Sequence, residues 1–140
     1  MKYLFVCTGN TCRSPMAEHL ARKFYPNSEY SSAGIYAVES QDATLGAISA
    51  MCKFDIDLSC HKSKALSPLL LNQYDYIVPM TFSHKQALLN LGLKEDKILM
   101  FSEEISDPFM CSDEVYLECA NQIKQNLDKL FGENDDNKAR

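Results

Sequence analysis

The chain has 140 residues and a formal net charge of −5, and hydrophobic residues make up 46% of it. That length predicts one domain with a sizeable core, and the acidic balance argues against nucleic acid as a partner and leaves no basic stripe for a membrane surface. We expect no leader peptide and no transmembrane segment, and therefore a cytoplasmic protein whose six cysteines are mostly free thiols.

Short apolar runs alternate with helical patterns along the chain. β-prone runs predict strands at residues 2–6, 30–33, 76–79 and 98–101. Apolar residues at three-to-four spacing predict helices at residues 15–25, 42–54, 67–72, 83–91 and 113–131. This alternation predicts a single α/β domain over residues 1–131, with three α/β/α layers and a central four-stranded parallel sheet. Residues 132–140 are polar and charged, and we expect them to form a disordered tail.

The segment that follows the first predicted strand carries the chemistry. Residues 7–14 read Cys-Thr-Gly-Asn-Thr-Cys-Arg-Ser and lead into Pro15. Gly9 and Asn10 tolerate left-handed backbone angles, and Ser14 before Pro15 predicts a helix start in which the serine caps free N–H groups. A tight turn between a buried strand and a helix leaves backbone N–H groups unpaired, so this segment is predicted to bind an anion.

Two side chains make this anion site a candidate catalytic site. Arg13 supplies a planar fork of donors that fits two oxygens of a phosphate group. Cys7 faces the same positive field, which favours the reactive thiolate over the thiol. The predicted substrate-binding residues of the loop are Thr8, Gly9, Asn10, Thr11, Cys12 and Ser14. A packing role is as good an interpretation for Cys12 as a functional one.

Residues 6–15 resemble the signature of the low-molecular-weight protein tyrosine phosphatases. Further segments follow in family order to about residue 131. Ser32-Ala33-Gly34 resembles the end of the family's second strand, and residues 61–64 resemble its His-x-Ser/Ala-Arg segment, with Lys64 in place of the arginine. Asp107-Pro108-Phe109 resembles the loop that carries the general acid. The resemblance implies a phosphatase that hydrolyses phosphotyrosine in proteins through a cysteinyl-phosphate, with no metal or other cofactor.

The resemblance also implies roles for individual side chains. Asp107 is expected to protonate the leaving oxygen and then to activate water, although an Asp-Pro pair is also common in surface turns. Ser14 is expected to donate a hydrogen bond to the Cys7 thiolate. Asn10 is expected to hold the loop in shape through side-chain bonds, with Ser32 as a candidate partner. The three histidines are expected to be structural, and His61 to hydrogen-bond near the loop.

Three residues bear on the choice of substrate. Tyr36 and Phe109 are candidates for the aromatic walls of a cleft that admits phosphotyrosine and excludes the shorter phosphoserine. Thr11 favours another substrate, because many tyrosine-specific relatives resemble this loop with a bulkier aliphatic residue there, whereas bacterial protein-arginine phosphatases resemble it with threonine. Phosphoarginine is therefore the alternative substrate. The sequence leaves the oligomeric state open.

Other classes of function fit the sequence less well. Thiol-dependent arsenate reductases resemble this fold and loop, but they use further cysteines after the third strand, and no cysteine occurs here between that strand and Cys111. A phosphate-binding or redox-sensing module is a third possibility, with a reversible Cys7–Cys12 disulfide as its switch.

The other cysteines do not predict a metal site. Cys60 and His61 are adjacent, but no second paired set of ligands accompanies them. Cys52, Cys111 and Cys119 are instead expected to pack against the sheet.

Overall fold

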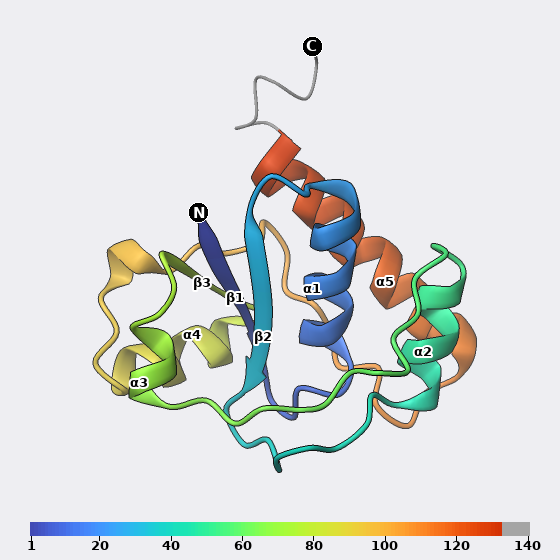
Figure 1. Ribbon diagram of the computed structural model, residues 1–140, viewed down its shortest axis with the longest axis horizontal. Coiled ribbons are helices and arrows are strands. Elements are labelled where there is room, and N and C mark those ends of the chain that lie inside the picture. Colours follow the sequence, from blue (N-terminus) through green and yellow to red (C-terminus); the bar gives the residue numbers. More distant parts are fainter. Residues whose placement is uncertain (133–140) are drawn as a thin grey trace.

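The structure, a computed structural model, describes residues 1–132. A parallel sheet with the strand order β2-β1-β3 lies at its centre, formed by β1 (Lys2–Cys7), β2 (Glu29–Gly34) and β3 (Tyr76–Pro79). One face of the sheet carries α1 (Arg13–Phe24), α2 (Leu45–Cys52) and α5 (Asp113–Leu127), and the other carries α3 (Pro68–Leu71) and α4 (Phe82–Asn90) (Figure 1). The predicted α/β class and parallel sheet are confirmed.

The central strand β1 is buried on both faces. Leu4 and Val6 belong to the core cluster on the side of α3 and α4, whereas Phe5 and Cys7 belong to the cluster on the side of α1 and α5. Because successive side chains of a strand point to opposite faces, a strand between two helical layers needs a continuous apolar run. The register pairs Cys7 with Gly34 of β2, so the cysteine lies at the carboxyl edge of the sheet.

The predicted fourth strand at residues 98–101 does not form. Within the described chain, this segment joins the sheet by a single parallel bridge between Ile98 and Ile77 of β3. Beyond the bridge the chain leaves the sheet, because the Glu103 N–H donates to Oδ1 of Asn126 in α5, 3.2 Å away, rather than to a strand. The sheet therefore has three strands and not four.

Most helices begin with a hydroxyl cap. In α2, α3, α4 and α5 the capping side chain accepts from the backbone N–H three residues ahead, the capping residues being Thr44, Ser67, Thr81 and Ser112. α1 differs: it begins two residues earlier than predicted, and its capping residue, Cys12, accepts no such bond. The prediction that Ser14 caps this helix is therefore wrong, because Ser14 lies inside the first turn. The first N–H groups of α1 are left for another acceptor.

The remaining elements are short. A 3₁₀ turn, η1 (Glu95–Lys97), follows α4, and a π-helical turn, η2 (Asp128–Gly132), extends α5. The predicted tail at residues 132–140 lies outside the described residues, apart from Gly132. Between residues 1 and 132, no helix is both long and apolar enough to cross a membrane.

Candidate active site

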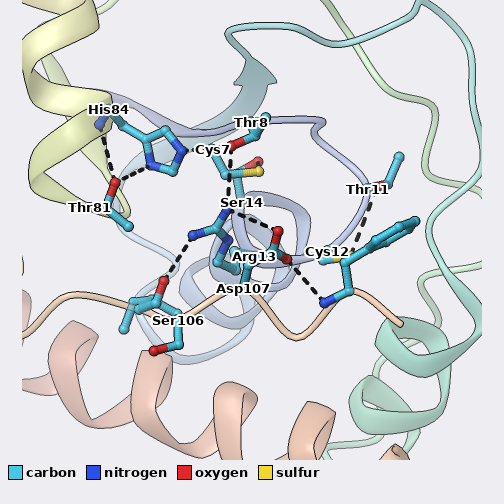
Figure 2. A network of polar contacts seen from close by, with 12 residues as sticks. Cys7, Thr8, Thr11, Cys12, Arg13, Ser14, Thr81, His84, Ser106 and Asp107 are labelled. Carbon is cyan, nitrogen blue, oxygen red and sulfur yellow. Dashed lines mark hydrogen bonds and ion pairs between the residues drawn. The ribbon is translucent and has the colours of Figure 1, made fainter. Parts of the chain in front are cut away.

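A cavity of about 260 Å³ lies at the carboxyl end of β1 and beside the start of α1. It is lined by Cys7, Thr8, Gly9, Thr11, Cys12, Arg13, Gln41, Asp107 and Phe109. Ligands of open α/β sheets bind at this end of the strands. The fold thus brings together the three residues that were predicted to be catalytic, Cys7, Arg13 and Asp107, although Asp107 comes from a loop far along the sequence (Figure 2).

The backbone of residues 7–14, here named the phosphate loop, is arranged to receive an anion. Backbone donors outside the loop occupy its carbonyl oxygens, pairing Ile35 with Cys7 at 3.0 Å, Tyr36 with Thr8 at 2.9 Å and Thr44 with Thr11 at 3.0 Å. The N–H groups of residues 8–12, in contrast, find no acceptor within residues 1–132. Asn10 has a φ of 57°, the left-handed conformation expected from its residue type. Unpaired N–H groups beside a helix N-terminus form an anion site.

Ser14 contacts the sulfur of Cys7. Its Oγ lies 2.9 Å from Cys7 Sγ, and Asn10 Nδ2 donates to the same Oγ at 2.9 Å. A thiolate can only accept a hydrogen bond, so the Ser14 hydroxyl donates to the sulfur when Cys7 is ionised. The contact between Ser14 and Cys7 that the family resemblance implied is present. Both Ser14 and Asn10 are fully buried, so they support the loop from behind and do not line the cavity.

The side chain of Asn10 connects the phosphate loop to β2. Its Nδ2 also donates to Ser32 Oγ at 2.9 Å, and Ser32 Oγ donates to Glu18 Oε1 at 2.6 Å. Its Oδ1 accepts from the Lys64 N–H at 2.9 Å, which fixes the orientation of the amide. The predicted contact with Ser32 is confirmed. Every polar atom of this buried amide is paired, so the network holds the loop in one conformation.

His61 supports the same residue from the other side. Its Nε2 lies 2.8 Å from the backbone oxygen of Asn10. A carbonyl oxygen can only accept, so Nε2 carries the hydrogen. The expectation that His61 bonds near the phosphate loop is confirmed.

Arg13 is held at the cavity by backbone and side-chain contacts. The residue is buried, and its Nη1 donates to the Ile105 carbonyl at 2.9 Å. Its Nη2 lies 3.7 Å from Asp107 Oδ2 and donates to Thr8 Oγ1 at 3.5 Å. The guanidinium carries five N–H donors in a plane, so these contacts leave donors free for a phosphate. Figure 2 shows Arg13 between Cys7, Thr8 and Asp107.

Asp107 lies on an exposed loop. Its side chain is 53% exposed, and its Oδ1 accepts from the Phe109 N–H at 3.1 Å, a contact that fixes the local turn. One carboxylate oxygen thus faces Arg13 and the other holds the loop. A carboxyl group at this position can exchange a proton both with a molecule bound in the cavity and with water.

Cys12 packs into a polar recess beneath the cavity. Its Sγ lies 3.4 Å from Thr44 Oγ1 and 3.5 Å from the Tyr116 hydroxyl. Burial, together with the hydrogen bond to Cys12, raises the pKa of Tyr116 to about 12, so the phenol stays protonated. The cysteine both lines the cavity and packs, which agrees with each of the two interpretations left open from sequence.

The two aromatic residues differ in position. Phe109 lines the cavity as predicted, although 56% of its surface remains exposed. Tyr36 is 80% exposed and does not line the cavity described for residues 1–132. What the structure assigns to Tyr36 is a backbone role, since its N–H donates to the Thr8 carbonyl.

Three contributors to the site were not predicted from sequence. Gln41 lines the cavity, and the Ile105 carbonyl binds Arg13. His84, which was expected to be merely structural, lies in α4 with Nε2 2.9 Å from Thr8 Oγ1. A signal did exist for His84: it follows β3 closely, and the carboxyl ends of parallel strands meet at one edge.

Three possible metal ligands lie behind the phosphate loop. Glu18, His19 and His61 each place a ligand atom within 4.8 Å of the others. The Glu18 carboxylate, however, already accepts from Ser32 and pairs with Arg22 Nη2 at 2.5 Å. Burial lowers the pKa of His19, so its ring favours the neutral form. This group connects α1 to the loop through hydrogen bonds that need no ion.

The other cysteines are mostly at the surface. Cys52 and Cys111 are exposed, so the prediction that they pack against the sheet is wrong: Cys52 ends α2 on its outer side, and Cys111 lies in an exposed loop. Cys119 does pack, and burial raises the pKa of its thiol to about 12. This thiol is therefore not a second nucleophile.

The chain resembles known proteins over almost its whole length. The model of the family "Low molecular weight phosphotyrosine protein phosphatase" matches residues 2–140. The low-molecular-weight protein-tyrosine-phosphatase PtpB of Staphylococcus epidermidis is 32% identical over 137 residues, with 93% of this chain and 96% of that protein covered. The protein-arginine-phosphatase of Bacillus subtilis is 34% identical over 142 residues, with 93% and 94% covered.

The fold agrees with a solved structure as well. The structure of a YwlE arginine phosphatase, a cysteine-to-serine mutant with a phosphorylated active-site serine, superposes with a TM-score of 0.90 at 31% identity over 100% of both chains. The family expected from the sequence is thereby confirmed. The phosphate loop, the buried Cys7 and Asp107, which the resemblance implied for this chain, lie at one cavity. The chain therefore belongs to the low-molecular-weight phosphotyrosine protein phosphatase family of hydrolases.

Proposed function

We propose that this protein removes phosphate from protein side chains in two steps that share one cavity. The observation that carries the proposal is the Cys7 sulfur, 2.9 Å from Ser14 Oγ, in a cavity that Arg13 and Asp107 also line. A sulfur nucleophile, a set of N–H donors and a proton donor are the groups that phosphoryl transfer to a thiolate requires. The N–H groups and Arg13 neutralise the transferring group, so no metal ion is needed for this chemistry.

In the first step, the Cys7 thiolate attacks phosphorus. A phosphorus–sulfur bond forms, the bond from phosphorus to the substrate atom breaks, and Asp107 gives its proton to the leaving atom. In the second step, water attacks phosphorus and gives a proton to the Asp107 carboxylate. The phosphorus–sulfur bond breaks, inorganic phosphate leaves, and the sulfur regains its negative charge beside the Ser14 hydroxyl.

Phosphotyrosine is the first candidate substrate. Phe109 on the cavity wall supplies an aromatic contact for a phenyl ring, and the nucleophile lies buried at the sheet edge, where a long phosphorylated side chain reaches further than phosphoserine. The name of the Staphylococcus relative agrees with this choice.

The cysteines, all free, fit the reducing cytoplasm as the working compartment.

Phosphoarginine is the second candidate, and Thr11 favours it. The Thr11 side chain lines the cavity, and its hydroxyl has only a weak contact, 3.9 Å from Cys12 Sγ, within the described residues. A hydroxyl that is free at the wall can bond a polar guanidinium, whereas an aliphatic side chain there would pack against a ring. The names of two relatives, both protein-arginine-phosphatases, agree with this second candidate.

Matched peptides separate the two substrates. One peptide sequence is prepared with phosphotyrosine or phosphoarginine at the same position, and kcat/KM is measured for each. Thr11→Val removes the hydroxyl at constant volume, and Thr11→Ile also adds bulk. If phosphotyrosine is preferred and neither variant changes the ratio, the first candidate stands. A preference for phosphoarginine that Thr11→Val alone reverses assigns the second.

The shared mechanism has its own test. Rapid quenching of a reaction with ³²P-labelled p-nitrophenyl phosphate, whose leaving group needs little protonation, is expected to trap label on the protein. Asp107→Ala is expected to increase the trapped amount, because the second step then lacks its base. Cys7→Ala is the control that carries no label. Turnover without a trapped adduct in either protein would refute the cysteinyl-phosphate.

A further inference from the structure

His84 lies next to the active site, but the mechanism above does not use it. The side chain is 6% exposed and lies in the first turn of α4, directly after the carboxyl end of β3. Its Nε2 is 2.9 Å from Thr8 Oγ1, and its Nδ1 is 2.9 Å from Thr81 Oγ1 (Figure 2). Both ring nitrogens are therefore engaged, and both partners are hydroxyl groups.

Hydroxyl partners suit a neutral imidazole. A neutral ring has one donor and one acceptor nitrogen, and a hydroxyl can complement either. Burial, with a smaller effect of the Arg13 charge, lowers the pKa of His84 to about 4, and the carboxylates of Asp107 and Glu104 oppose this only in part. At neutral pH the ring is thus uncharged and adds no positive charge to the phosphate site.

The Thr8 hydroxyl connects the hydrogen bonds of His84 to the Arg13 side chain. Thr8 Oγ1 accepts from Arg13 Nη2 at 3.5 Å, and the other terminal nitrogen of Arg13 is fixed by the Ile105 carbonyl at 2.9 Å. Two contacts, one on each terminal nitrogen, define the plane of a guanidinium. Thr8 itself is exposed on the cavity wall, so without His84 its side chain has a free choice of rotamer.

We propose that His84 is a positioning residue for phosphate: by holding the Thr8 hydroxyl, it sets the orientation in which the Arg13 guanidinium meets the phosphoryl oxygens. This inference rests on the proposed function, because it assigns His84 to the same cavity. Thr81 in turn fixes the ring, since its Oγ1 also accepts the His84 N–H at 3.2 Å as the cap of α4.

Two variants of His84 distinguish the roles of its two ring nitrogens. The amide of His84→Gln reaches the place of Nε2 and can still bond Thr8, whereas the amide of His84→Asn reaches only the place of Nδ1 and can bond only Thr81. The dissociation constant of inorganic phosphate, measured by calorimetry, reports the cavity directly. Loss of one hydrogen bond predicts a weakening of about 3- to 10-fold in His84→Asn, and affinity close to that of the unmodified protein in His84→Gln.

Thr8→Val completes the experiment, because it leaves α4 untouched. It is expected to weaken phosphate binding as much as His84→Asn does, and the double variant Thr8→Val/His84→Asn is expected to be no weaker than either single variant. In turnover, KM for a phosphopeptide should rise more than kcat falls. Thermal unfolding of each variant shows whether its fold is intact.

Several results would overturn the inference. These are unchanged phosphate affinity in both His84→Asn and Thr8→Val, additive losses in the double variant, or equal losses in the Gln and Asn variants. If His84→Asn does not fold, Thr8→Val against His84→Gln decides the question. Failure of the proposed function is distinguishable, because it would appear as phosphate binding without phosphopeptide turnover in the unmodified protein.

Discussion

The Ser14 hydroxyl lies 2.9 Å from the Cys7 sulfur, and to a thiolate, which has no hydrogen of its own, the hydroxyl can only donate. A thiolate is the attacking group of the first step and the leaving group of the second. A hydrogen bond aimed at its charge therefore stabilises the protein before and after the phosphoryl group is bound to sulfur.

Ser14→Ala is expected to slow release of the phosphoryl group from sulfur more than it slows formation of the adduct. Loss of a hydrogen bond to a charged group predicts a fall in kcat of about 10- to 100-fold. Pre-steady-state assays should then show a burst of leaving group followed by slow turnover. Ser32→Ala is the matched control, because it removes the other acceptor of the Asn10 amide without touching the sulfur. An equal effect of the two substitutions would mean that Ser14 acts only through the loop.

Asp107→Asn is expected to lower kcat/KM, which reports the first step and not the second, according to the leaving group. For a phosphotyrosine peptide, whose phenol needs protonation, the predicted loss is about 10²- to 10⁴-fold. For p-nitrophenyl phosphate, whose leaving group is a much weaker base, the first step should lose less. Asp96→Asn, at an exposed site outside the cavity lining, is the control. The same loss for both substrates would contradict a role as proton donor.

Gly34→Ala is expected to disturb the phosphate loop from β2. A Cβ at this position would lie 2.7 Å from the Thr8 carbonyl oxygen and 2.9 Å from the Asn10 nitrogen, so the loop backbone must shift. Overpacking of this kind predicts a destabilisation of about 1–3 kcal/mol. Calorimetry should also find weaker phosphate binding. Binding and stability equal to those of the unmodified protein would show that the close approach has no effect.

Stability is expected to fall as the pH is lowered from about 6.5 towards 4. The pKa of His84 is lowered in the fold from 6.5 to about 4, so over this range the unfolded chain takes up a proton that the folded protein does not. The difference favours unfolding at acidic pH and vanishes above neutrality. Urea unfolding at several pH values should give a steeper decline for the unmodified protein than for His84→Gln. Parallel declines would contradict the assignment of a buried neutral ring.

The phosphate loop could be predicted because its parts are contiguous. A buried strand, left-handed turn residues and a helix start follow one another within residues 2–15, so Cys7 and Arg13 must meet at the sheet edge whatever the rest of the chain does. The contact of Asn10 with Ser32 needed only the neighbouring strand. Where the residues of a site are adjacent in sequence, the local structure determines how they lie relative to one another.

The features that sequence did not predict depend on distant partners. The segment after Ile98 leaves the sheet because Asn126, from α5, offers an acceptor to Glu103. Ser14 lies inside the first turn of α1, and its hydroxyl bonds Cys7 and Asn10 instead of capping the helix. In both cases a side-chain hydrogen bond competes with the secondary structure that the local residues favour, and neither partner can be recognised from spacing.

Nucleophile and guanidinium come from one short stretch of the chain, whereas the carboxyl group of Asp107 comes from a separate loop that meets this stretch through Arg13. Changes in the loop around Asp107 and Phe109 can therefore alter which substrates bind, while Cys7 and Arg13 continue to bind the phosphoryl group.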